Sequence, residues 1–76
     1  MNIPLYPVWG DTIEVKHDVV RKGSLILAHG KYLINGMAKG SKFRYWQLVI
    51  KHDINSKPFF VKKDDINQMF DKGILT

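Results

Sequence analysis

The stretch FRYWQLVIKH, residues 43–52, is the longest strand candidate in the chain. It is rich in aromatic and β-branched residues, which favour strands. Because side chains alternate between the two faces of a strand, Trp46, Leu48 and Ile50 share one face, and we expect that face to form part of the core. The other face carries Phe43, Tyr45, Gln47, Val49 and Lys51. The stretch therefore predicts a sheet with one buried face and one face on which aromatic rings stand beside cations.

Shorter strand candidates lie on both sides of this stretch. Residues 12–19 alternate between apolar and polar side chains, which predicts a half-buried strand. The apolar run within residues 24–29 is typical of a central strand. Asn35-Gly36 predicts a two-residue hairpin turn, because both residues tolerate the positive φ that such turns need. Residues 59–62 are expected to supply the last strand.

The chain is expected to end in a short helix over residues 65–72. Asp64 or Asp65 is the expected cap, because a carboxylate at that position accepts a free backbone amide and matches the positive end of the helix dipole. Gly73 is expected to stop the helix in the left-handed conformation. The apolar residues at helical spacing, which should face the core, are Ile66, Met69 and Phe70.

The length of 76 residues corresponds to a single domain. Residues 1–10 are expected to form an extended arm, because Pro4 and Pro7 restrict the backbone around them. Residues 12–63 hold the strands. About five short strands and one helix predict a mostly-β fold, either a small antiparallel barrel or a strongly curved sheet, Src-homology-3-like or similar. An open sheet packed on the helix is the alternative architecture.

No residue pattern indicates an active site or a metal site. The chain has no cysteine, and the three histidines, His17, His29 and His52, lack the spacing of a zinc site. His17 falls on the apolar face of the strand predicted at residues 12–19, so we expect a structural role for it. The serines are not placed on a strand–turn–helix nucleophile elbow. We therefore expect a protein that is not an enzyme and that uses no metal or cofactor.

The charge balance points to a polyanionic partner. The chain has 12 Lys and Arg residues against 7 Asp and Glu residues, a net charge of +5. On so small a domain this charge creates a positive field that favours nucleic acid or an acidic protein surface. A biased but inert surface would have the same composition. The candidate binding residues are Lys39, Lys42, Phe43, Arg44, Tyr45, Lys51, Arg21, Lys22, Lys62 and Lys63.

The chain carries no sequence signal for a membrane. No stretch approaches the ~20 apolar residues that a membrane span needs. The first residues also lack the basic and apolar regions of a signal peptide. We expect no membrane contact and a cytoplasmic location.

Two functions remain open at the level of sequence. The first is single-stranded or non-specific nucleic-acid binding, with bases stacked on Phe43 and Tyr45 and lysines neutralising phosphates. This function needs exposed rings, whereas the arm or the helix would bury them if either packed over this face. The second is protein–protein interaction, as an adaptor or as an inhibitor of a host protein of the kind that phages and mobile elements encode. An unpaired edge strand would also permit a homodimer.

Overall fold

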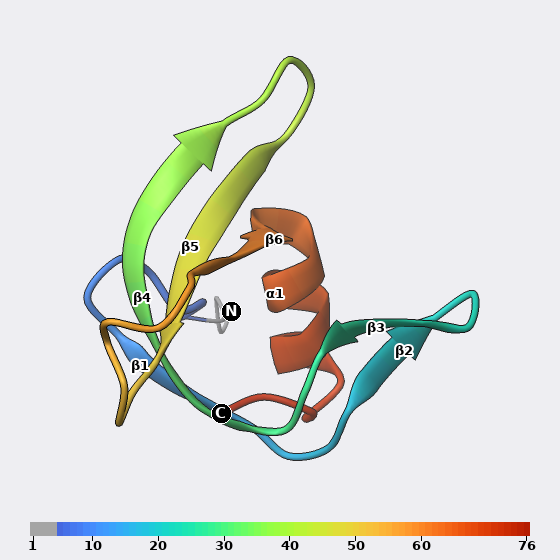
Figure 1. The fold of residues 1–76 in the computed structure, drawn as a ribbon. Coiled ribbons are helices and arrows are strands. Elements are labelled where there is room, and N and C mark those ends of the chain that lie inside the picture. Colours follow the sequence, from blue (N-terminus) through green and yellow to red (C-terminus); the bar gives the residue numbers. More distant parts are fainter. Residues whose placement is uncertain (1–4) are drawn as a thin grey trace.

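The structure, a computed structural model, describes residues 5–76. Its elements follow the chain in this order: β1 (Thr12–Val15), β2 (Val19–Arg21), β3 (Ser24–Leu27), β4 (Gly30–Lys39), β5 (Arg44–Ile50), β6 (Phe59–Lys62) and α1 (Lys63–Asp71) (Figure 1). The prediction of a mostly-β fold with a C-terminal helix is confirmed.

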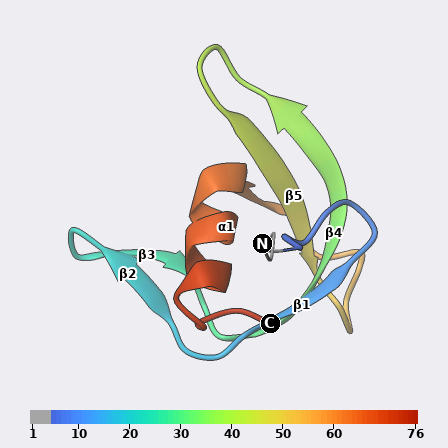
Figure 2. The ribbon, with the colours of Figure 1, turned by 180° about the vertical axis from the view of Figure 1, so that it is seen from behind.

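The larger sheet is antiparallel, has the strand order β1-β4-β5-β6, and bends around α1 (Figures 1 and 2). β2 and β3 form a separate two-stranded sheet. Neither sheet closes into a barrel, because α1 occupies the concave side of the larger sheet and β1 and β6 remain at opposite edges. The architecture is the alternative one, an open sheet packed on the helix.

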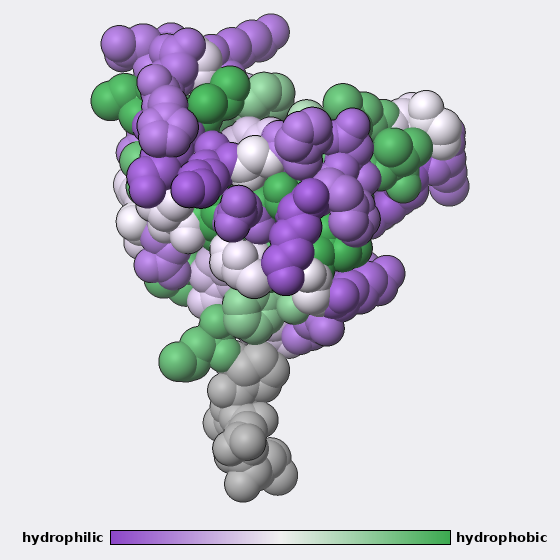
Figure 3. Space-filling model, turned by 90° about the horizontal axis from the view of Figure 1, so that it is seen from below, coloured by the Kyte–Doolittle hydropathy of each residue, from purple (hydrophilic) through white to green (hydrophobic). Residues whose placement is uncertain are grey.

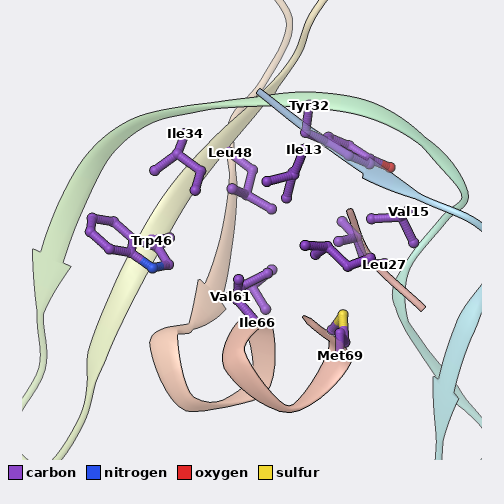
Figure 4. Packing of buried hydrophobic residues seen from close by; sticks show 11 residues of the cluster. Ile13, Val15, Leu27, Tyr32, Ile34, Trp46, Leu48, Val61, Ile66 and Met69 are labelled. Atoms are coloured by element: carbon purple, nitrogen blue, oxygen red, sulfur yellow. The ribbon is translucent and has the colours of Figure 1, made fainter. Parts of the chain in front are cut away.

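One apolar cluster joins the larger sheet, β3, α1 and the C-terminal tail (Figure 4). Its buried members are Ile13, Val15, Leu27, Tyr32, Ile34, Trp46, Leu48, Val61, Ile66, Met69 and Leu75. Trp46 and Leu48 are in the core as predicted. Ile50 is not, since it is the last residue of β5, where the chain turns back and the Asp53 amide donates to the Ile50 carbonyl.

The predicted turn at Asn35-Gly36 is wrong, because both residues lie inside β4. The pairing of β4 with β5 shifts between Ile34 and Met37, which is a bulge. A turn at this point would have left Trp46 and Leu48 without partners on β4, whereas the continuous strand sets Ile34 opposite Leu48 and Met37 opposite Trp46. Apolar pairing along β5 therefore outweighs the local turn preference.

The two real hairpin turns lie elsewhere. β4 and β5 are joined by residues 40–43, where the Gly40 amide donates to the Phe43 carbonyl at 2.8 Å. β2 and β3 are joined by Lys22 and Gly23, whose φ values of 53° and 77° are those of a two-residue turn with both residues left-handed. Lys22 therefore adopts the left-handed backbone conformation that Asn or Gly more often occupies at this position of such a turn.

The predictions for the first strands need two corrections. The strand expected over residues 12–19 breaks after Val15, and His17 lies outside any strand and is exposed, so it has no core role. The run within residues 24–29 is not central, because β3 pairs only with β2 and leaves Leu25 exposed. Alternation and apolar content indicate strands, but they do not say which strands become neighbours.

The helix begins two residues earlier than predicted and is not capped by an aspartate. Lys62 occupies the N-cap position without a side-chain hydrogen bond, and Asp64 and Asp65 lie in the first turn. Asp65 instead forms an ion pair with Arg21 of β2 at 3.0 Å. At the other end Gly73 has φ 75°, and the Ile74 amide donates to the Met69 carbonyl, as expected for a glycine stop.

Both ends of the described chain return to the body of the protein. The amide of Glu14 donates to the Thr76 carbonyl at 2.8 Å, and the Thr76 amide donates to the Glu14 carbonyl at 3.0 Å, so the tail covers the outer edge of β1. The Tyr6 hydroxyl donates to the Asp71 carboxylate at 2.9 Å, and its ring meets Phe70 edge to face. The arm therefore lies against α1. The part of the predicted arm that includes Pro4 lies outside the described residues.

Candidate binding face

The face of the larger sheet that points away from α1 carries the predicted aromatic residues. α1 packs on the face that holds Trp46 and Leu48, and Tyr45 belongs to the opposite one. Residues directly opposite one another in an antiparallel pair point to the same side of the sheet. Tyr45 is opposite Ala38 on β4 and Lys62 on β6, so these three side chains share the outer face.

A lysine and an aromatic ring meet at one corner of this face. The ammonium nitrogen of Lys62 lies 4.0 Å from the centre of the Phe43 ring, within the range of a cation–π contact. Phe43 remains 42% exposed, and Tyr45 is half-buried. Neither α1 nor the described part of the arm covers them, because α1 packs on the opposite face and Tyr6 of the arm contacts α1. The ring exposure that nucleic-acid binding requires is therefore present.

A shallow apolar hollow opens beside these rings. It has a volume of about 350 Å³ and is lined by Ala38, Lys39, Gly40, Tyr45 and Phe60. Phe60 is 56% exposed and forms the wall on the β6 side. A Cβ at Gly40 would lie 3.1 Å from the Phe43 carbonyl oxygen, a tight contact, and 3.6 Å from a Tyr45 ring carbon, an ordinary contact distance. We define the binding face as this hollow together with Phe43, Lys62 and the hairpin tip described next.

The tip of the β4–β5 hairpin supplies the positive charge of the binding face. Lys39 and Arg44 are opposite each other at the end of the pairing, and Lys42 lies in the turn between them. All three are exposed. The sequence from Lys39 to His52 contains no acidic residue. The hairpin extends past the end of α1 (Figure 1), so these cations project from the body of the protein.

The structure brings five of the ten predicted binding residues to this hollow or beside it, namely Lys39, Lys42, Phe43, Tyr45 and Lys62. Arg44 is at the same hairpin tip, but it alternates with Tyr45 and belongs to the strand face that holds Trp46. Lys63 follows Lys62 in sequence but turns to the helix side, where its nitrogen lies 4.6 Å from the centre of the Trp46 ring. Lys51 follows the far end of β5, roughly 20 Å along the strand from Tyr45.

Arg21 and Lys22 also stay away from the binding face. They belong to the β2–β3 hairpin, and α1 lies between this hairpin and the larger sheet (Figure 1). Arg21 is paired with Asp65, so part of its charge is neutralised. The far end of the molecule, seen from below in Figure 3, shows apolar residues scattered among polar ones.

Sequence reasoning missed the contribution of Phe60 and Ala38 to the binding face. Phe59 and Phe60 are consecutive strand residues and must point to opposite faces, so one of them had to leave the core. The structure places Phe59 on the same side as Leu48, with its ring edge to face against Tyr32, and places Phe60 on the outer face. Ala38 carries no comparable signal in the sequence.

The groups with displaced pKa values lie outside the binding face. Hydrogen bonds from the backbone and side chain of His29 lower the pKa of Asp18. The hydrogen bond to Asp71 raises the pKa of Tyr6, and burial raises that of Tyr32. Within residues 5–76, no group of three or more His, Asp or Glu side chains is arranged to hold a metal ion. Over the same residues, α1 is too short and too polar to cross a membrane.

Comparison of this chain with models of known families, with curated proteins and with solved structures yields no match.

Proposed function

We propose that this protein is a non-enzymatic module that binds nucleic acid through the binding face. The observation that carries the proposal is the combination of exposed Phe43 and half-buried Tyr45 with Lys62, which stands over Phe43, on a sheet face that the helix leaves free. Polyanions with flat bases are the ligands that match a surface of rings and cations.

The two kinds of side chain have separate tasks in this proposal. Lys39, Lys42 and Arg44 at the hairpin tip bind phosphates, which makes the affinity depend on salt. Phe43 and Tyr45 contact bases or sugars. Lysine binds phosphate as a point charge and reads no base edge, so the binding is expected to tolerate many sequences.

A titration with a matched charge control tests this function. Labelled single-stranded and duplex oligonucleotides of DNA and RNA are titrated with protein at low salt and followed by fluorescence anisotropy. We expect micromolar binding that weakens as salt rises. The variant K39A/K42A/R44A should lose most of the affinity, whereas K51A/K57A/K72A, which removes the same charge elsewhere, should lose much less. No binding at low salt, or equal losses in the two variants, would contradict the proposal.

A second candidate function is protein–protein interaction, including self-association. The observation that favours it is the edge of β6, which pairs with β5 on one side and with no strand of the described chain on the other. Phe59 and Phe60 are both exposed at this edge, and an unpaired edge can accept a further strand from an acidic partner or a second copy. Light scattering after size-exclusion chromatography would reveal a dimer, and a nuclease-treated pull-down that recovers no stoichiometric partner would count against a different protein.

A further inference from the structure

We infer that the hollow between the β4–β5 hairpin and β6 holds one unstacked base, so that the ligand of this protein is single-stranded nucleic acid. The inference rests on the proposed function and adds the form of the ligand and the place where it is read. It depends on the shape and lining of the hollow and is therefore independent of the charge at the hairpin tip.

The size of the hollow suits a single planar group. Its volume is about 350 Å³, close to the lower end of the roughly 300–1,000 Å³ that small-molecule pockets span. Tyr45 and Phe60 supply aromatic walls, and Ala38 and Gly40 leave room because their side chains are small or absent. A base in a duplex is already stacked between its neighbours and cannot present its faces to these rings. A single strand can turn one base out at little cost.

The chemistry of the lining indicates how that base is recognised. The side chains of Ala38, Tyr45 and Phe60 present mainly apolar surface, and Lys39 is a donor without an acceptor. Aromatic stacking accepts every base because each base has a π-face. The hollow is therefore expected to bind strands with bases more tightly than abasic strands, and single strands more tightly than duplexes. It should discriminate only weakly between different bases.

The surrounding charge favours a nucleotide over an aromatic side chain of a protein. Lys39 is part of the hollow, Lys62 lies on the same sheet face over Phe43, and Lys42 and Arg44 are at the hairpin tip. β6 and the segment from Lys39 to His52 contain no carboxylate. A chain with one negative charge per nucleotide would meet Lys39 in the hollow and Lys62 on the same sheet face.

The test compares three ligands of about ten nucleotides, the length of a typical single-strand site. They are a single strand, the matching duplex, and a strand of the same length in which every base has been replaced by an abasic sugar. We expect the wild-type protein to bind the base-bearing strand at least fivefold more tightly than the abasic strand, and also more tightly than the duplex. A strand with a single 2-aminopurine should show quenched fluorescence on binding, because the base stacks on a ring.

Two variants separate the hollow from the phosphate contacts. Ala38→Leu fills the hollow without changing charge, and Phe60→Ala removes one wall. Each should reduce the affinity for the base-bearing strand to that for the abasic strand, while the affinity for the abasic strand stays unchanged. Phe59→Ala is the matched control, since it removes the neighbouring ring from the opposite face. Circular dichroism verifies that each variant is folded.

The outcomes distinguish failure of the inference from failure of the proposed function. If the wild-type protein binds all three ligands equally, or if Ala38→Leu keeps its preference for bases, nucleic-acid binding stands and the single-base site is wrong. If no ligand binds at low salt, both fall. If an acidic peptide with an aromatic residue binds in the hollow and no oligonucleotide competes with it, the hollow belongs to a protein partner. The 2-aminopurine measurement uses the wild-type protein and does not depend on the variants being folded.

Discussion

Gly36 occupies the most constrained position in the sheet. Its φ is 149°, at the edge of the region that side chains rarely adopt, and a Cβ added there would lie 3.2 Å from the side-chain oxygen of Gln47. The Asn35-Gly36 pair thus marks a place where the backbone needs glycine. The need comes from the bulge that keeps Ile34 and Met37 in register with β5.

Gly36→Ala should therefore destabilise the protein, by about 1 kcal/mol or more. Urea unfolding at equilibrium measures the loss, and Asn35→Ala serves as the control because Asn35 is the exposed neighbour in the same bulge. The slope of the unfolding transition should stay the same. Equal stability of Gly36→Ala and the wild type would show that Gln47 and the bulged backbone can shift to accommodate the added methyl group.

Asp18 links the stability of the β2–β3 hairpin base to pH. One of its carboxylate oxygens accepts hydrogen bonds from the His29 amide at 2.9 Å and from His29 Nδ1 at 2.7 Å. These bonds lower the pKa of Asp18 below its ordinary value of 3.8. A group whose pKa is lower in the folded state stabilises the fold above its unfolded pKa and loses that contribution as pH falls through the folded pKa.

We therefore expect Asp18→Ala to be less stable than the wild type at neutral pH, with a difference that shrinks below about pH 4. Urea unfolding midpoints across the acid range measure this difference. Asp53→Ala, which removes an exposed carboxylate from the loop after β5, provides the comparison. A difference between Asp18→Ala and the wild type that stays constant down to strongly acidic pH would rule out the carboxylate as its source.

At the scale of elements, the two edges of the larger sheet differ. The outer edge of β1 is covered by the C-terminal tail through the reciprocal hydrogen bonds of Glu14 and Thr76, while β6 is open on its outer side in the described chain. The tail is anchored by Leu75, which is 1% exposed and bridges to Val15. In the described chain, covering the β1 edge leaves β6 as the edge of the larger sheet where another strand can be added.

Leu75→Ala should release this tail. Loss of a buried leucine costs about 2–5 kcal/mol, a large part of the stability of so small a domain. Thermal or urea unfolding gives the total effect, and hydrogen exchange at the Glu14 amide reports the loss of the tail itself. Ile74→Ala, at a half-buried neighbour, should cost less. Unchanged protection of the Glu14 amide in Leu75→Ala would mean that backbone pairing holds the tail without its side chain.

At the scale of the whole molecule, a single apolar cluster connects all the elements. Leu27 of β3, Trp46 of β5, Ile66 of α1 and Leu75 of the tail belong to the same set of buried residues. No part of the described chain has a second core of its own. A domain with one shared core is expected to unfold in one cooperative step.

Two probes should therefore report the same unfolding transition. In a Trp9→Phe variant, fluorescence comes from Trp46 alone, which is in the core, whereas Trp9 is exposed. The midpoint from Trp46 fluorescence should coincide with the midpoint from far-ultraviolet circular dichroism. Separate midpoints would indicate that the helix, the hairpin or the larger sheet unfolds independently.

The sequence by itself determined the mostly-β class, the C-terminal helix and much of the core, but not every strand boundary or turn. Alternation along residues 43–52 predicted Trp46 and Leu48 inside, and the spacing of Ile66, Met69 and Phe70 predicted the inner side of α1. These signals are local, because they follow from the periods of strands and helices. Clustering of cations between Lys39 and Arg44 was equally visible, since those residues are neighbours in the chain.

Only the tertiary structure decided which strands pair, where the chain turns and which residues share a face. The pairing of β4 with β5 moved the turn from Asn35-Gly36 to residues 40–43, because burying the apolar face of β5 is worth more than one favourable turn. The same pairing brought Ala38 to Tyr45, and the pairing of β5 with β6 placed Phe60 on the same face. The position of the β2–β3 hairpin beside α1 set Arg21 against Asp65. Contacts between residues distant in sequence depend on packing of the whole chain, and no local pattern contains that information.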